Sequence, residues 1–264
     1  MLGKLFKYDF KWINKIMPIY YILLVLISIA TKIIEHLLNT DPSLLLVIVD
    51  KILVSMFIGV AIPVIVTCLM RIWVRFSINM YRDESYLTHT LPVTRNQLFN
   101  AKVLSGITSL LISSLVIAAC IAFVFLNKDS IDSIKIMWNS LVDAYNTLFA
   151  VGFVIGIILL IALEIIYMMM SGILGLTIGH CFNNFKILKS IIIGIGSYFL
   201  LSTVSLTTII IIGKAIDYDI IGNGFPSMNY IGIIGITSLL IYGIYDIAYY
   251  LVAKKVFNKG VNVE

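Results

Sequence analysis

Charged residues are scarce in this chain: Asp, Glu, Lys and Arg make up only 12% of its 264 residues. A soluble domain needs about a quarter charged residues to cover its surface. Half of that supply means that most of the surface faces something other than water. The composition therefore excludes an ordinary water-soluble enzyme or binding domain, and the net charge of +5 is too modest to predict nucleic-acid binding.

Motifs for catalysis and metal binding are also missing. Cys68, Cys120 and Cys181 lie in or beside apolar runs without short spacings, so they predict neither a disulfide framework nor a metal site. The sequence contains no H-E-x-x-H motif and no G-x-x-x-x-G-K-[ST] phosphate loop. We therefore expect no metal site, no bound cofactor and no ATP hydrolysis by that route in this chain.

The chain instead has six apolar stretches that are long enough to cross a membrane. A helix needs about 20 mostly apolar residues to span a hydrocarbon core about 30 Å thick. Pro63 predicts a kink in the second stretch, which neighbouring helices must accommodate. The predicted spans cover residues 16–34, 52–70, 103–127, 144–179, 190–213 and 230–253. The sequence thus predicts an all-α membrane protein with a single transmembrane domain over 1–264.

Lysine and arginine are unevenly distributed among the segments that connect these spans. With the N-terminus inside, the outer segments keep only a few of the 19 basic residues: Lys32, Lys51, Lys128, Lys135 and Lys214. Most acidic residues fall on the same outer side. Because cytoplasmic loops carry an excess of Lys and Arg, we expect both termini to lie in the cytoplasm.

Residues 1–15 carry a helical pattern ahead of the first span. Lys4, Lys7, Lys11 and Lys15 fall within about 80° on a helical wheel, and apolar residues cover much of the remainder. This predicts an amphipathic helix that lies on the inner leaflet. A solvated basic tail is the alternative.

The loop between the third and fourth spans has a similar period. Its apolar residues recur at helical spacing: Ile131, Ile134, Trp138, Leu141, Val142 and Tyr145. We expect a short amphipathic helix on the outer surface, with Trp138 at headgroup level. An extension of the fourth span is the alternative. Within that span, Ser171, Gly175 and Gly179 repeat every four positions, which favours close helix packing.

Two acidic residues, Glu164 and Asp246, lie inside predicted spans. An unpaired charge at mid-bilayer costs about 2.5–3.5 kcal/mol on insertion scales, so each side chain should face protein or water. We expect Asp246 to bond to tyrosines at i−4, i+3 or i+4. Glu164 is expected to line a cavity or to pair with Arg71 or Arg75. Because intramembrane acids often mark ion paths, an ion-gradient-driven carrier or channel is one functional hypothesis.

The longest segment on the cytoplasmic side, 71–102, has structural signals of its own. Thr94, followed three residues later by Gln97, predicts a capping box at the start of the next helix. Pro92 biases Leu91 away from helix, so we expect a break between two helical pieces. The result is a short helix, rich in charged and aromatic residues, that is held between two spans and projects inward.

The run DESYLTHTLPVT over residues 83–94 resembles the D-E-G-Y-L-T-x-T-L-P-V-S signature of bacterial permease subunits of ABC-2 type ABC transporters. The opening MLGKLFKYDFKW is similar to the Lys-rich start of that family. Six spans, inside termini and a basic tail extend the resemblance over the whole chain. The run departs from the signature at Ser85, where the family usually has Gly, and at Thr94, where it has Ser.

The resemblance implies the permease subunit of an exporter in the bacterial cytoplasmic membrane. It implies a second permease, identical or related, and two copies of a separate ATPase that binds ATP and Mg. Segment 71–102 would be a coupling helix in a groove of that ATPase, with the contact made by Asp83, Glu84, Tyr86, Leu87 and His89. Known relatives export lantibiotics, other antimicrobial peptides or amphipathic peptides, often for self-protection. A membrane enzyme acting on lipids or peptides is disfavoured, because no nucleophile and base are expected at one depth.

Overall fold

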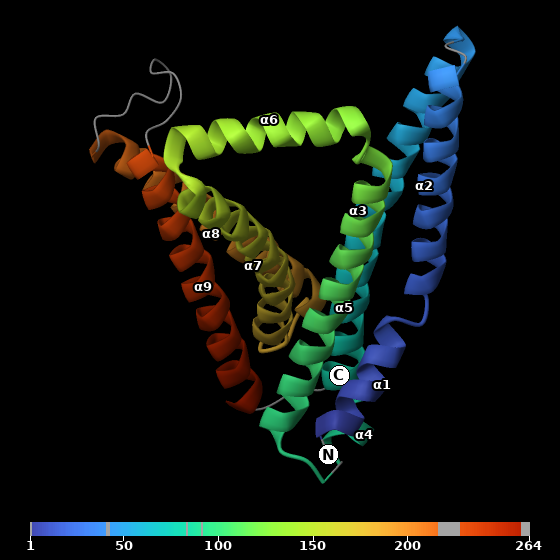
Figure 1. Ribbon diagram of the computed structural model, residues 1–264. Helices are drawn as coiled ribbons and strands as arrows, with labels where there is room; N and C mark the ends of the chain where they lie inside the picture. The colour runs from blue at the N-terminus through green and yellow to red at the C-terminus, as the bar shows by residue number, and fades with distance from the viewer. Residues whose placement is uncertain (1, 41–42, 83, 91, 216–227, 260–264) are drawn as a thin grey trace. The chain divides into compact units, whose positions relative to one another are not determined.

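The computed structural model describes residues 2–40, 43–82, 84–90, 92–215 and 228–259, and these residues form helices and their connections without a strand (Figure 1). The helices are α1 (Leu2–Ile13), α2 (Met17–Thr40), α3 (Leu44–Tyr81), α4 (Ser85–His89), α5 (Arg95–Phe125), α6 (Lys128–Tyr145), α7 (Thr147–Gly179), α8 (Lys186–Ala215) and α9 (Met228–Lys259). The expectation of an all-α protein is confirmed for this part of the chain.

Six helices are long and apolar enough to span a membrane, namely α2, α3, α5, α7, α8 and α9. Each contains most or all of one predicted span, and the chain is a multi-pass membrane protein. Several of the helices extend beyond the predicted bounds of their spans. Thus α3 begins at Leu44 and continues through Pro63 to Tyr81, and α5 begins at Arg95.

The chain divides into two compact units, and α3, α5 and α6 contribute residues to both. The first unit comprises Met1–Arg75 and Asn100–Ile136. Polar side chains join α2 and its leading turn to α5 in this unit. Tyr21 and Ser113 share a hydrogen bond of 2.7 Å between their hydroxyl oxygens, and Asn14 Nδ2 donates to Ser109 Oγ at 2.7 Å. These bonds satisfy polar groups among apolar helices, where an unpaired group would be costly.

A buried ion cluster fixes α1 within the first unit. Asp9 is only 3% exposed, and its Oδ1 accepts from Arg75 Nε at 3.0 Å and from Lys102 Nζ. The Arg71 guanidinium donates to the carbonyls of Trp12 and Ile13 at the end of α1. Lys4, Lys7, Lys11 and Lys15 are exposed or lie on the exposed side. The structure contains a helix at Leu2–Ile13. The predicted amphipathic helix on the membrane surface stays a prediction.

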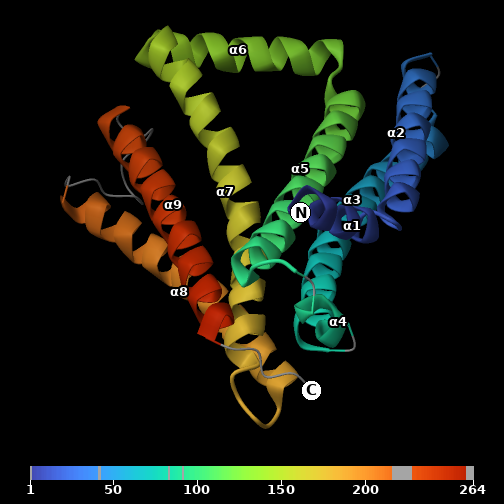
Figure 2. The ribbon, with the colours of Figure 1, turned by 90° about the horizontal axis from the view of Figure 1, so that it is seen from below.

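The second unit comprises Phe76–Phe99 and Met137–Glu264, and α7 packs along both α8 and α9 (Figure 2). Glycine makes the approach of α7 to α8 possible. A Cβ on Gly175 would lie 2.7 Å from Cα of Gly194, and a Cβ on Gly179 would overlap the backbone of Ser190. The expectation that the small residues of this span serve packing is confirmed.

A break separates α6 from α7. Asn146 has φ 88°, in the left-handed region that Asn tolerates better than most residues, and its side chain accepts from Phe149 N at 2.9 Å as an N-cap. The predicted helix between the third and fourth spans is therefore separate, and the alternative of an extended fourth span is wrong.

Candidate functional site

A short helix and a capping box lie in the segment that joins α3 to α5. The short helix α4 forms at Ser85–His89, and the chain then leaves helical geometry before α5 begins at Arg95. Thr94 N donates to Gln97 Oε1, and Gln97 N donates to Thr94 Oγ1, both at 3.3 Å. This reciprocal pair is a capping box, and it fixes where α5 starts.

Aromatic residues from three long helices form a packed platform beside α4 in the second unit. The Phe76 ring lies 6.0 Å from that of Phe99 and 6.4 Å from that of Phe257, and all three side chains are buried. Tyr81, at the end of α3, stacks on His180 with ring centroids 4.1 Å apart. The platform therefore brings together the ends of α3, α5, α7 and α9.

Polar contacts tie the start of α5 to the end of α9. Arg95 Nη1 donates to the carbonyl oxygen of Asn258 at 3.1 Å, and Asn258 Nδ2 donates to Asn96 Oδ1 at 2.8 Å. The α4 segment is thus held on both sides. Before it, Tyr81 at the end of α3 stacks on His180, and after it, the start of α5 is bonded to Asn258 of α9.

The predicted contact residues of α4 do not share one face. Tyr86 is 78% exposed and Leu87 is 70% exposed, so both point away from the protein. His89 points inward: its Nε2 lies 3.4 Å from the Met80 carbonyl oxygen, and its ring lies 6.1 Å from that of Phe257.

Of the two acidic residues of the segment, Asp83 and Glu84, the structure describes Glu84. Glu84 is the N-cap residue of α4 and is partly exposed. Its backbone carbonyl oxygen accepts from Thr88 Oγ1 at 2.7 Å. Asp83 lies outside the described residues. The predicted contact residues that are exposed or partly exposed at α4 are therefore Glu84, Tyr86 and Leu87, which form a small surface with one acidic, one phenolic and one apolar side chain.

The intramembrane acids lie in a polar cluster between α7, α8 and α9. Tyr198 donates to Glu164 Oε1 at 3.0 Å, and Tyr242 is a second hydrogen-bonding neighbour of Glu164. Glu164 is close enough to Asp246 for their charges to interact. Both carboxylate oxygens of Asp246 are enclosed by protein and have no hydrogen-bond partner.

The expected bonds from tyrosines to Asp246 are wrong for this structure. Tyr249 instead donates to the carbonyl oxygen of Ser197 on α8 at 2.9 Å, and Tyr167 donates to the same oxygen at 2.6 Å. A tyrosine side chain is long enough to pass its neighbour on the same helix and reach the next helix. Lys254 Nζ lies 3.2 Å from the hydroxyl of Tyr250, the remaining candidate.

Arg71 and Arg75 have partners within the first unit. Arg71 binds the end of α1, and Arg75 binds Asp9, while both guanidinium groups lie over the Trp12 ring at 4.6 and 5.2 Å. The partner of Glu164 that the structure shows is Tyr198 rather than an arginine.

Asp9 is the polar residue that the sequence reading missed. On a helical wheel it lies opposite the three lysines of α1, within the apolar face. An acidic residue among apolar neighbours indicates a basic partner on another element, because a buried charge must be paired. That signal could have led to Arg75 and Lys102.

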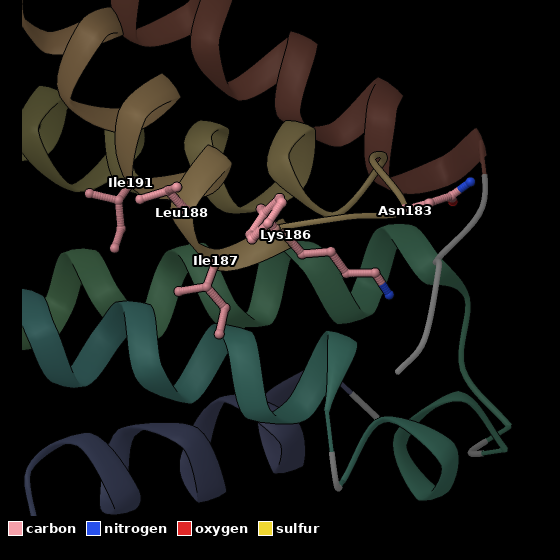
Figure 3. A pocket seen from close by; sticks show the side chains of 6 residues that line it. Asn183, Lys186, Ile187, Leu188 and Ile191 are labelled. Atoms are coloured by element: carbon pink, nitrogen blue, oxygen red, sulfur yellow. The ribbon is translucent and has the colours of Figure 1, made fainter.

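An open depression lies at the start of α8 (Figure 3). It is lined by Asn183, Phe185, Lys186, Ile187, Leu188 and Ile191. All of them come from one short stretch of chain, so the depression is a surface feature without converging polar groups and indicates no substrate site. Among the described residues, no group of three His, Cys, Asp or Glu side chains could hold a metal ion.

Comparison of the chain with protein-family models, with curated proteins and with solved structures finds no match.

Proposed function

We propose that this chain is the transmembrane subunit of an ABC exporter. It would work with a second permease, identical or related, and with two copies of a separate ATPase that binds ATP and Mg. The proposal places the chain in the cytoplasmic membrane of a bacterium, with both termini and α4 inside. The cargo class would be an amphipathic or antimicrobial peptide, which rests on the resemblance of residues 83–94 to the permease signature.

The observation that carries the proposal is the geometry of α4. A short helix braced on packed helix ends presents Tyr86 and Leu87 outward, as a helix that docks into a soluble partner would require. Exposed apolar side chains on an ordered, polar segment are typical of an interaction site. Burial of Leu87 in a groove would stabilise the complex by about 1.5–3 kcal/mol.

The same geometry supports a route for mechanical coupling. Tyr81 stacks on His180 beside the turn between α7 and α8, and His89 lies against Phe257 near the end of α9. Movement of an ATPase that holds α4 would therefore act on α3, α7 and α9 together. In this proposal the three helices respond as a group because their ends are packed against one another.

Copurification after a Leu87→Asp substitution tests the proposal. The variant should stay in the membrane but lose the ATPase, with affinity at least about tenfold weaker, since a loss of about 1.4 kcal/mol already gives that factor. Phe182→Asp is the matched control, because Phe182 is an exposed aromatic residue in the turn between α7 and α8. An intact complex with unchanged ATPase activity in Leu87→Asp would mean that the segment is an ordinary linker.

A second candidate function is an ion-gradient-driven carrier or channel that uses Glu164 and Asp246. The unpaired, enclosed oxygens of Asp246 beside Glu164 favour it, because two acids at one depth need a proton or a cation to compensate their charge. The two candidate functions differ in whether transport requires a separate ATPase. A carrier would move its substrate after purification of this chain alone, whereas a permease subunit would be inactive without its ATPase.

A further inference from the structure

The length of α6 and its short connections to α5 and α7 restrict where it can lie. It comprises 18 residues, Lys128–Tyr145, which makes it about 27 Å long at 1.5 Å per residue. Only residues 126–127 separate it from the end of α5, and only Asn146 separates it from α7. Since α5 and α7 are long and apolar enough to span a membrane and α6 joins them directly, both ends of α6 are tied to ends of spans on the same side of the membrane.

The two sides of α6 differ in chemistry. At 100° per residue, Ile131, Ile134 and Trp138 fall within about 60° of one another on the helical wheel. Asp132 lies about 130° from the centre of this strip, and Lys135 lies at its edge, about 70° from the centre. The two side chains form an exposed ion pair of 3.0 Å.

The apolar face of α6 is exposed in the part of the chain that the structure describes. Ile134 is 52% exposed and Trp138 is 38% exposed. Ile131 and Met137 are exposed as well. An apolar strip of this length in water would be unfavourable, so something outside the chain must cover it.

We propose that the outside cover is lipid and that α6 is a membrane-surface helix. Ile131, Ile134 and Trp138 insert below the headgroups on the side where α5 ends and α7 begins, while Asp132 and Lys135 remain in water. The short connections to α5 and α7 hold the helix where those spans end, and the indole ring of Trp138 is of a type enriched at the headgroup region. A surface helix of this type buries its apolar face about 5–10 Å into the boundary between headgroups and acyl chains. This inference requires only a multi-pass membrane protein and does not rest on the proposed transport function.

Tryptophan fluorescence tests the inference with the full chain in nanodiscs of phosphatidylcholine and phosphatidylglycerol. The signal of Trp138 is the difference between the parent chain and Trp138→Phe, which leaves Trp12 and Trp73 unchanged. We expect lipids brominated high on the acyl chain to reduce this signal at least about twofold more than lipids brominated near the chain end. Iodide added to the buffer should leave it almost unchanged.

The opposite side of the same helix supplies the control. Ile136 is 67% exposed and lies on the polar side, so Ile136→Trp combined with Trp138→Phe should respond to iodide and little to bromine. Quenching of Trp138 by iodide alone would place its face in water and overturn the inference. Protection of Trp138 from both quenchers would also overturn it, because the face would then be covered by a second copy or a partner protein. Equal bromine quenching at positions 136 and 138 would exclude a helix that lies along the surface.

Discussion

Asp9 lies opposite the lysine face of α1 and is the only acidic residue of that helix. Three cations from two other helices gather around it and around the end of α1: Arg71, Arg75 and Lys102. A buried carboxylate with two cationic partners holds a helix in one place more specifically than apolar contacts do, although such a pair adds little net stability compared with an apolar equivalent. The position of α1 therefore depends on one side chain.

Replacement of this carboxylate should have a large effect. Asp9→Asn removes the carboxylate that Arg75 and Lys102 bind. Removal of one partner of a buried pair costs about 3–5 kcal/mol. We expect a clear fall in the thermal unfolding midpoint of the detergent-solubilised chain. Asp132→Asn is the control, because Asp132 and Lys135 form an exposed pair worth at most about 1 kcal/mol. Similar midpoints for the two variants would show that the ion cluster does not fix α1.

At the scale of single residues, the sequence identified which polar groups lie in the spans but not their partners. Glu164 and Asp246 were recognisable because a charge among apolar residues is unusual. Their partners come from other helices: Tyr198 reaches Glu164 from α8, and Tyr249 reaches Ser197 instead of Asp246. Spacing along one helix does not determine which neighbouring helix a long side chain will meet.

At the scale of helices, sequence reasoning was more successful, because local signals act over a few residues. Thr94 and Gln97 located the start of α5, and Pro92 marked the break after α4. The boundary between α6 and α7 was misplaced by a few residues, since the predicted span began at 144 and the helix begins at Thr147. The cause is Asn146, whose left-handed backbone and capping side chain interrupt an apolar pattern that otherwise continues.

The contact between α7 and α8 gives a test at the level of helix packing. Gly175→Ala would place a Cβ 2.7 Å from the Gly194 backbone, so the helices must separate. We expect a loss of about 1–3 kcal/mol in unfolding free energy, as for other overpacked sites. Gly152→Ala is the control within the same helix, because a Cβ there meets nothing within 4 Å. That change should be neutral or stabilise the helix by about 0.5–1 kcal/mol. Equal effects at both positions would contradict the close-packing interpretation.

The division of the molecule into two units could not be predicted from the sequence. It depends on which helices make contact across long separations, and α3 and α5 pass from one unit to the other without a break in the helix. Within the second unit, α7 packs on both α8 and α9, and the aromatic platform joins the ends of four helices. This arrangement puts the α4 segment and the cluster around Glu164 in the same unit, so a change at one can affect the other.

The orientation of the whole molecule is tested by the two ends of α5. Asn96 lies in its first turn, while Ser133 lies on α6, which follows its last turn. Because α5 is long enough to cross the membrane, the two positions should lie on opposite sides. A cysteine at position 133, in a chain without Cys68, Cys120 and Cys181, should react with an impermeant thiol reagent added to whole cells. A cysteine at position 96 should react only after the cells are opened, because the excess of Lys and Arg places that end inside. The reverse pattern would put α4 outside the cell, where no ATPase could hold it, and would end the exporter proposal.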